Sequence, residues 1–440
     1  MLRGINKAQK DDAYRLLQCL TVASRPLLVE ELAELLAFDF QASISREIPK
    51  LREDWRWDDE EEAVLSTCCS LIAIVRNGDS QVVQFSHFSV KEFLTSPRLA
   101  RSSHTDVSRF HIDLEPAHTI MAQACLATLL RLDDDAENDD AKWSPLVGYA
   151  AQHWVDHAQF GNVSSRVRDG MDDLFDPSKL HFSAWLLEHD MDEDWSFFSP
   201  RPRRGIGSPL YYAALCGFYD LAERLILKHP EQVNAPGGRI VAPLPAALYK
   251  RHYHVVDLLY RHGAVADVQD TDAYTPLHMA SNCGNIDVIR WLLDHGANAN
   301  AQELTGWTPL HYATFSIHLD AVQVLLEHKA DINLQDIKGQ TLLYMFLHYQ
   351  GSSPEGKIVD VVRRLLEHGA NPNITTDWNS SPLHEASSSG WLEVTRLLLS
   401  YGAKVNERDQ VGRTPFQVAT SEGRHEITKL LLEHGAVPRP

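Results

Sequence analysis

The amino-acid sequence predicts a mainly helical protein with three parts: a winged-helix-like domain over residues 1–103, a helical connector over 104–204 and an α-solenoid over 205–440. Three observations predict this fold class. Similar heptapeptides recur seven times in the last part, at intervals of 33 or 34 residues with one exception. The first part combines helix patterns with two short strand patterns, and the middle part contains helix patterns that do not repeat.

Composition and charge limit the classes of function. A chain of 440 residues can form two or three domains, and 44% apolar with 23% charged residues is usual for a globular protein. The net charge of −19 disfavours binding to nucleic acid or to an anionic membrane, because phosphates attract Lys and Arg. The six cysteines contain no C-x-x-C pair, which indicates reduced thiols and a cytoplasmic or nuclear protein. The sequence has no run of 18 apolar residues and no secretory signal, so we expect no membrane contact.

The first part has the pattern of a winged helix. Residues 10–37 predict two helices with a turn at residues 24–26. The stretch EEEAVLSTCCSLIAIV predicts a third helix that leads into a strand, and SQVVQFSHFSV predicts a second strand before the helix SVKEFLTSP. Many winged helices bind DNA, but residues 1–100 hold 16 acidic and 12 basic side chains. This balance of −4 disfavours DNA binding.

Each repeated unit has the parts of a helix pair. The heptapeptides begin at Ser208 (SPLYYAA), Ala242 (APLPAAL), Thr275 (TPLHMAS), Thr308 (TPLHYAT), Thr341 (TLLYMFL), Ser381 (SPLHEAS) and Thr414 (TPFQVAT). Thr or Ser before Pro is a helix N-cap followed by a favourable first residue, and Leu310 and Ala313 lie on one face of the helix. Gly284 ends one such helix, and Gly296 ends the second, amphipathic helix of that unit. A single unit cannot bury its apolar face, so we expect the units to stack.

This pattern resembles the ankyrin repeat, with which it shares the period and the T-P-L-H-x-A motif. The resemblance covers residues 205–440 and about seven units. In ankyrin repeats the TPLH histidine is a hydrogen-bonding residue of the tight turn. The resemblance therefore implies a structural role for His278, His311 and His384.

Two units depart from the pattern. The unit at Thr341 lacks both the proline and the histidine, and it carries about seven extra residues within HYQGSSPEGK. Its glycines, serines and proline predict a protease-sensitive surface loop over residues 350–356. The unit at Ala242 is degenerate as well.

The first 200 residues carry a second resemblance. LLQCLTVASRPLLVEELAELL and FSHFSVKEFLTS resemble the winged-helix segment of fungal NACHT-type signalling ATPases, a segment named after GPI inositol-deacylases. FHIDLEPAHTIMAQACLATLL and PLVGYAAQHWVDHA resemble the helical connector of the same proteins. The chain thus resembles the C-terminal part of that architecture. The sequence contains no G-x-x-x-x-G-K-[ST] phosphate loop and no G-x-S-x-G nucleophile elbow. A natural relative without the ATPase and a truncated gene model both stay open.

Other clusters of polar residues give weak signals. His153 and His157 are spaced i, i+4, as in some zinc sites, but HWVDH lacks the glutamate of H-E-x-x-H and no third ligand is marked. Cys68 and Cys69 are interpreted as apolar packing, and the acidic run 133–140 as a solvated loop. We therefore expect neither a metal nor a cofactor.

These observations predict a non-enzymatic adaptor protein, with a role in fungal signalling implied by the resemblance. It would bind a protein partner on the concave face of the array, and its first half would be a regulatory or docking module. In ankyrin arrays the residue before the Thr, the residue after the His and those near the end of the first helix face the concave side. The corresponding residues here are Tyr274, Met279, Asn282, Trp307, Tyr312, Phe315, Gln340, Glu385 and Arg413.

The aromatic residues of this set are the strongest candidates for binding anchors. Leu310 and Ala313 already supply the buried stripe, so packing between units is not expected to need Trp307 or Tyr312. In the alternative interpretation these rings fold back onto neighbouring turns. Two alternative functions stay open: the sensor portion of a NACHT-type switch whose ATPase is missing from this chain, and a hydrolase of the kind that the deacylase name suggests.

Overall fold

A computed structural model describes most of the chain, and the described residues form two compact units. One unit comprises residues 1–196 and 205–232, and the other comprises 197–204 and 233–440. The described residues are 2, 5, 9–40, 48–52, 59–68, 71–78, 80–132, 144–189, 191, 206–238, 240–349 and 355–438. Within these ranges, no helix is both long and apolar enough to cross a membrane.

The predicted winged helix is confirmed. Its elements are α1 (Lys10–Val22), β1 (Leu27–Leu28), α2 (Val29–Leu36), β2 (Phe38–Asp39), β3 (Lys50–Leu51), α3 (Glu60–Cys68), β4 (Ile72–Asn77), β5 (Ser80–Phe85), α4 (Phe88–Leu94), α5 (Pro97–Ala100) and α6 (Thr105–Ser108). Strands β4 and β5 form the antiparallel wing, in which Ile74 pairs with Val83. The short strand β1 adds to β5, so the sheet order is β1-β5-β4.

The helical connector packs on the first repeat within the same compact unit. The elements are α7 (Leu114–Leu129), α8 (Val147–Ala158), α9 (Val163–Arg166), α10 (Arg168–Leu174), α11 (His181–Glu188), α12 (Pro209–Cys216) and α13 (Tyr219–Lys228). A buried aromatic cluster joins them: the ring of Trp154 lies 5.3 Å from that of Trp185 and 5.6 Å from that of Phe218. Tyr212 adds an edge contact to Phe182 at 5.6 Å. The connector therefore covers the face that the first repeat would otherwise expose to water.

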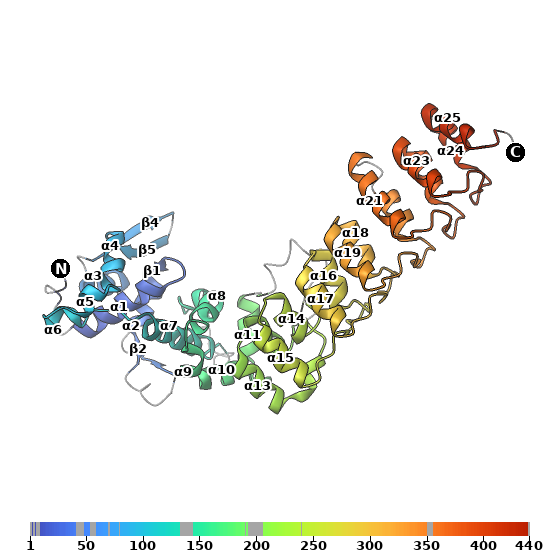
Figure 1. Ribbon diagram of the computed structural model, residues 1–440. Helices are drawn as coiled ribbons and strands as arrows, with labels where there is room; N and C mark the ends of the chain where they lie inside the picture. The colour runs from blue at the N-terminus through green and yellow to red at the C-terminus, as the bar shows by residue number, and fades with distance from the viewer. Residues whose placement is uncertain are drawn as a thin grey trace. The chain divides into compact units, whose positions relative to one another are not determined.

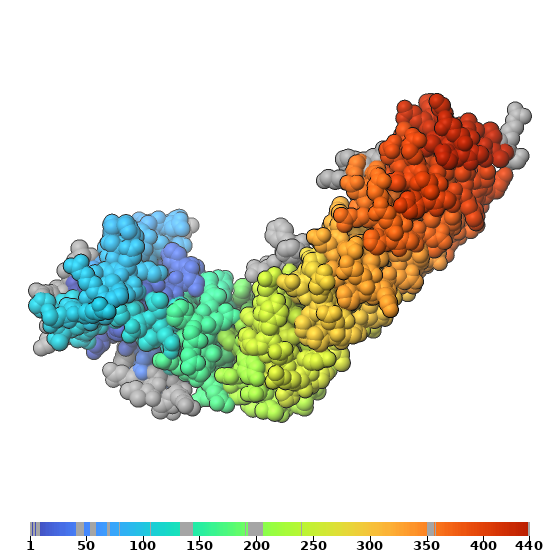
Figure 2. Space-filling view, viewed as in Figure 1, coloured from blue at the N-terminus to red at the C-terminus, as the bar shows by residue number. Residues whose placement is uncertain are grey.

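The second compact unit is a stack of helix pairs that follow one another in sequence order, and the space-filling view shows them packed together (Figures 1 and 2). The elements are η7 (Pro230–Asn234), α14 (Pro243–Tyr249), α15 (Tyr253–Arg261), α16 (Pro276–Cys283), α17 (Ile286–Asp294), α18 (Pro309–Phe315), α19 (Leu319–Glu327), α20 (Leu342–Tyr349), α21 (Glu355–Glu367), α22 (Pro382–Ser389), α23 (Leu392–Ser400), α24 (Pro415–Ser421) and α25 (His425–Glu433). Each predicted heptapeptide begins a helix, so the solenoid is confirmed. We call the even-numbered helices from α12 to α24 inner helices and their partners outer helices.

The predicted caps hold these helices in place. Ser208, Thr275, Thr308, Ser381 and Thr414 are N-caps whose side chains accept a hydrogen bond from the third residue of the helix. Gly284 and Gly296, the glycines expected at helix ends, adopt the left-handed conformation, and Gly390 does the same at the end of α22. Leu310 is buried as expected, with 1% of its surface exposed, and Leu383 at the same position of the unit at Ser381 is buried with 0% exposed. Of the loop predicted at residues 350–356, residues 350–354 lie outside the described residues, and the prediction is wrong for Glu355 and Gly356, which begin α21.

Candidate functional site

A turn of five residues precedes the capping residue of each inner helix from α16 onward. The extra residues of the unit at Thr341 lie before α21 and outside these turns. We call these turns fingers; residues 303–307 form one and residues 336–340 the next. Neighbouring fingers are linked through their backbones, because the amide of Ile337 donates to the carbonyl of Thr305 at 3.2 Å. Gly306 has a φ of +85°, and a Cβ there would lie 2.7 Å from the Cα of Asp336. The fingers thus form a closely spaced row.

Thr308 and His311 fix the start of α18. The amide of Thr308 donates to Nδ1 of His311 at 3.1 Å, and the amide of His311 donates to Oγ1 of Thr308 at 3.4 Å. This reciprocal cap fixes Trp307, the last residue of the finger, next to the first turn of the helix that carries the half-buried Tyr312. The structural role predicted for His311 is confirmed.

Four aromatic rings form a continuous cluster at this turn. Trp307 lies 5.3 Å from Tyr312 and 5.5 Å from Phe315, measured between ring centroids. Phe315 in turn contacts Tyr349 on the next inner helix at 5.8 Å. These separations are typical of favourable edge and offset ring contacts. We call Trp307, Tyr312, Phe315 and Tyr349 the aromatic cluster.

A hollow of about 330 Å³ opens between the aromatic cluster and two fingers. It is lined by Glu303, Thr305, Trp307, Tyr312, Asp336, Ile337, Lys338 and Tyr349. The lining therefore combines aromatic rings with two carboxylates, one ammonium group, one apolar side chain and one hydroxyl side chain. Such a mixture of apolar surface with a few polar groups is typical of a binding site.

The carboxylates of the hollow also shape the fingers. Oδ1 of Asp336 accepts hydrogen bonds from the amides of Lys338 and Gln340, each at 2.8 Å. Oε1 of Glu303 accepts from the hydroxyl of Thr305 and from the amide of Trp307. Each carboxylate is thus held in place by its own finger, with Asp336 half-buried and Glu303 buried.

The tips of four fingers carry apolar side chains that contact water. Leu304, Ile337, Trp378 and Val411 are exposed by 46% to 76%. We call these residues the fingertip ridge. Apolar tips on consecutive turns are informative, since turns usually carry polar residues. The ridge was not predicted, although the apolar residues at finger positions in ELTGW, DIKGQ, TDWNS and DQVGR indicate it in the sequence.

The structure divides the predicted binding residues into two groups. Tyr274, Met279 and Gln340 are exposed by only 4% to 6%, so their side chains cannot serve as contact surface; this corrects their predicted exposure. Tyr274 is covered because the ring of Tyr312 packs against it at 5.4 Å. Gln340 is covered in the finger before the degenerate unit.

The other predicted residues retain some surface. Trp307, Tyr312, Asn282 and Glu385 are half-buried, and Phe315 and Arg413 are exposed. Glu385 contacts the hydroxyl of Tyr344 at 3.4 Å and Nδ1 of His348 at 3.3 Å. Their role in binding stays a prediction. Tyr349 and Ile337 belong to the hollow but were not predicted, because Tyr349 lies at the end of a unit without the regular motif.

The candidate zinc pair at His153 and His157 does not form. His157 is fully buried, where its Nε2 lies 2.9 Å from the hydroxyl of Tyr149 and its Nδ1 lies 2.8 Å from Nδ1 of His118. Burial lowers the pKa of His157 to about 3. His153 instead contacts Asp156 at 3.2 Å. Across the described parts of the chain, no group of three His, Cys, Asp or Glu residues could hold a metal ion.

Two other weak clusters fall outside the description of side chains. The side chain of Cys68 and all of Cys69 lie outside the described residues, as does the acidic run 133–140. The interpretation of these residues as packing and as a solvated loop stays a prediction.

Family comparisons agree with this architecture. The family described as "Ankyrin repeats (3 copies)" matches residues 244–336 and 347–439, and the family described as "GPI inositol-deacylase, winged helix domain" matches residues 2–106. The chain therefore contains ankyrin repeats and a winged helix domain of the GPI inositol-deacylase type. Ankyrin repeats are typically non-catalytic and bind protein partners.

Individual relatives cover parts of the chain. It is 32% identical over 286 residues to "Azaphilone pigments biosynthesis cluster protein L" of Monascus ruber, an alignment that covers 60% of this chain and 58% of that protein. The chain thus spans less than two thirds of the length of this relative. Among solved structures, the ankyrin repeat domain of Bcl-3 is 30% identical, with a TM-score of 0.45 over 52% of this chain and all of that one.

Proposed function

We propose that this protein is a non-catalytic adaptor that binds a protein partner through the aromatic hollow of its ankyrin array. The observation that carries the proposal is the aromatic cluster at the hollow, where Trp307 and Tyr312 are half-buried and Phe315 is exposed by 38%. Partly exposed Trp and Tyr side chains on a rigid scaffold are frequent binding anchors, because they offer large contact area at low entropic cost. A cytoplasmic or nuclear location and a role in signalling fit this proposal.

Substitution of Trp307 by Ala tests the proposal. Trp307 contacts Tyr312 and Phe315, so the change should lower the free energy of unfolding by only about 1 kcal/mol. It should weaken partner binding by about 2 kcal/mol or more, since anchor residues dominate interface energies. The measurement is quantitative recovery of partners by the tagged full-length chain from an extract, together with urea unfolding of each variant.

Trp291 provides a matched control. It lies on the outer helix α17, where it stacks on His295 with ring centroids 3.8 Å apart. Trp291→Ala removes the same kind of side chain from an outer helix, away from the hollow. This variant should therefore recover the same amount of partner protein as the unmodified chain. If Trp307→Ala unfolds the array while partner recovery stays unchanged, Trp307 is a packing residue and the hollow is not the binding site.

The absence of enzymatic activity is also testable. The sequence contains neither the phosphate loop nor the nucleophile elbow, so we expect the isolated chain to neither bind ATP nor hydrolyse esters. Isothermal titration calorimetry with Mg²⁺-ATP and a chromogenic ester assay check this expectation. Saturable heat on nucleotide addition would contradict it.

A second candidate function is the regulatory portion of a NACHT-type nucleotide switch. It is favoured by a hollow of about 470 Å³ on the winged helix, lined by Leu2, Leu71, Ser89, Val90, Phe93, Leu94 and Val107. Beside it, Phe88 is 73% exposed and Phe93 is 42% exposed. An apolar surface of this kind suits contact with a further domain.

The 5′ end of the transcript separates the two functions. An upstream in-frame G-x-x-x-x-G-K-[ST] would favour the switch, since the phosphate loop would then precede the winged helix in one polypeptide. An in-frame stop codon directly upstream would favour the adaptor. The hydrolase alternative has no comparable support, because the sequence contains no nucleophile elbow.

A further inference from the structure

The hollow of the ankyrin array combines three aromatic side chains with two carboxylates. Trp307, Tyr312 and Tyr349 line it together with Glu303 and Asp336. An aromatic face carries partial negative charge, and a carboxylate carries a full one. Both kinds of side chain therefore attract a cation more than they attract a neutral or anionic group.

The surrounding fingers extend the negative field. The fingers at residues 270–274, 303–307, 336–340 and 376–380 contain five carboxylates and one ammonium group, a net charge of −4. The carboxylates belong to Asp270, Asp272, Glu303, Asp336 and Asp377, and the ammonium group belongs to Lys338. An acidic rim around an apolar hollow concentrates cationic ligands and accelerates their association.

We propose that the hollow receives a lysine or arginine side chain from a basic segment of the protein partner. This inference rests on the proposed function and deepens it by naming the chemistry of the partner. The cation lies against the rings of Trp307, Tyr312 and Tyr349, and the carboxylates of Asp336 and Glu303 balance its charge. Apolar residues that flank it in the partner contact the fingertip ridge, where Ile337 borders both surfaces.

An acidic or purely apolar anchor fits the hollow less well. An acidic side chain would meet two carboxylates of its own sign, with Lys338 as the one opposing charge in the lining. An aliphatic anchor would cover the half-buried carboxylate of Asp336 without replacing its contact with water. A cation satisfies the carboxylates and the rings together, so charge complementarity favours it.

Peptide display on the full-length chain tests this inference. A library of random twelve-residue peptides is selected on the unmodified chain and counter-selected on the Trp307→Ala variant, so that the retained peptides depend on the hollow. Each retained peptide is then synthesised with lysine replaced by norleucine or arginine by citrulline, which removes the charge and keeps the shape. We expect enrichment in Lys and Arg, and a loss of affinity of about tenfold or more on neutralisation at one position.

Two substitutions in the protein provide the reciprocal test. Asp336→Asn keeps the oxygen that accepts the two amide hydrogen bonds but removes the charge, so affinity for the basic peptides should fall roughly threefold to tenfold. Lys338→Glu should strengthen it, because the exposed ammonium group at the rim opposes the incoming cation. Asp409→Asn is the matched control: it changes the equivalent residue of the last finger and should leave affinity unchanged.

The outcomes separate this inference from the proposed function. Peptides that depend on Trp307 and tolerate neutralisation of every Lys and Arg would overturn the cationic anchor and leave the hollow as a binding site. If no peptide depends on Trp307, both the inference and the proposed function are wrong. A loss of affinity on Asp336→Asn that Asp409→Asn reproduces would also overturn the inference, since it would then reflect overall charge.

Discussion

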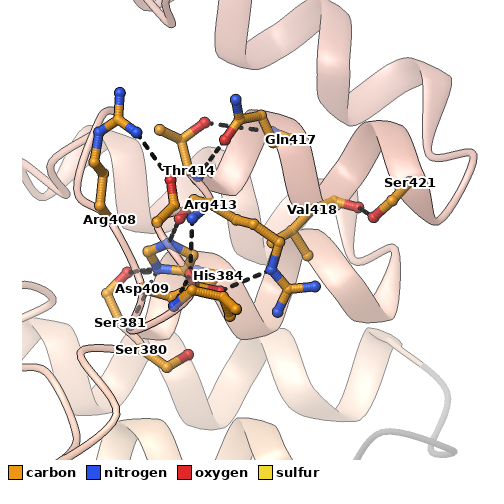
Figure 3. A network of polar contacts seen from close by, with 12 residues as sticks. Ser380, Ser381, His384, Arg408, Asp409, Arg413, Thr414, Gln417, Val418 and Ser421 are labelled. Atoms are coloured by element: carbon orange, nitrogen blue, oxygen red, sulfur yellow. Dashed lines mark hydrogen bonds and ion pairs between the residues drawn. The ribbon is translucent and has the colours of Figure 1, made fainter. Parts of the chain in front are cut away.

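The turns at Thr308 and Ser381 share one sequence motif but differ in a single hydrogen bond. In both turns the histidine accepts from the cap through Nδ1, with amide-to-Nδ1 distances of 3.1 Å. Nε2 of His384 also donates to the carbonyl of Arg413 in the following unit at 3.0 Å (Figure 3). Nε2 of His311 is buried and makes no hydrogen bond to any described residue.

The difference arises in the unit that follows each turn. His278 and His384 precede units with a regular T-P start, and their Nε2 atoms reach the carbonyls of Trp307 and Arg413, each at 3.0 Å. His311 precedes the degenerate unit at Thr341, which lacks the proline and the histidine. The second bond of each histidine therefore depends on the geometry of the next unit and not on its own turn.

The missing bond changes the electrostatics of the histidine. Burial, with a smaller contribution from His278, lowers the pKa of His311 to about 3. Burial also lowers the pKa of His384, but the hydrogen bond to the Arg413 carbonyl and the nearby Asp409 carboxylate oppose this effect. Two copies of one motif thus differ in how strongly they resist protonation.

The largest expected effect tests whether the two units also differ in packing. Leu310 and Leu383 are exposed by only 1% and 0%, so Leu→Ala at either position should cost about 2–5 kcal/mol of unfolding free energy. We expect similar costs, because both leucines lie between stacked helices in the interior of the array. Urea unfolding of the full chain, followed by far-UV circular dichroism, measures both.

Leu432→Ala is the control. Leu432 on α25 is 46% exposed, so its substitution should lower the unfolding free energy much less. A much smaller loss for Leu310→Ala than for Leu383→Ala would show that the degenerate unit loosens the core as well as the turn.

Acid sensitivity is the second way to sharpen the comparison. The unfolded chain binds a proton on His311 near pH 6.5, whereas the folded chain does so only near pH 3. Stability linked to this histidine is therefore complete above pH 6.5 and declines as the pH falls toward 3. At pH 5 the decline amounts to about 2 kcal/mol.

His311→Gln should remove that decline without breaking the turn. Gln417 occupies the equivalent position in the last unit, where its Oε1 accepts from the amide of Thr414 at 3.0 Å. The unfolding free energy of His311→Gln, relative to that of the unmodified chain, should therefore rise by about 2 kcal/mol from pH 7.5 to pH 5. Urea titrations at both pH values measure it. For His384→Gln the corresponding rise in unfolding free energy should be smaller, because other interactions oppose the lowering of the His384 pKa by burial. Equal pH profiles for His311→Gln and the unmodified chain would show that His311 titrates normally.

Local signals explain why much of the fold could be predicted from the sequence. The cap at Thr308, the proline after it and the left-handed Gly284 each act within a few residues, so the heptapeptides located every inner helix. The strand pairing of the wing followed from two short apolar runs separated by a turn. Strand β1 was missed because two residues carry too little pattern.

The candidate site was less predictable because it depends on contacts between units. Exposure of Tyr274 is decided by Tyr312 of the next unit, which covers it. Tyr349 lines the hollow but belongs to the unit at Thr341, which lacks the regular motif, so no repeat position predicted it. Whether Nε2 of His311 makes a hydrogen bond depends on the position of a carbonyl in the following unit, which a turn motif does not specify.

The smallest expected effect isolates the hydrogen bond itself. At pH 7.5 both histidines are neutral in the folded chain, since burial lowers the pKa of each. His384→Gln keeps the cap but removes the donor to the Arg413 carbonyl, which still accepts from the amide of Asp409 at 2.9 Å. The loss should therefore be that of one partly compensated hydrogen bond, about 1 kcal/mol. His311→Gln removes no such bond and should change stability by less than about 0.5 kcal/mol under the same conditions. A difference of this size in urea unfolding at pH 7.5 would confirm that the two turns differ by one bond between units. If both variants lose the same amount, the bond from His384 contributes nothing measurable, and the comparison reduces to burial alone.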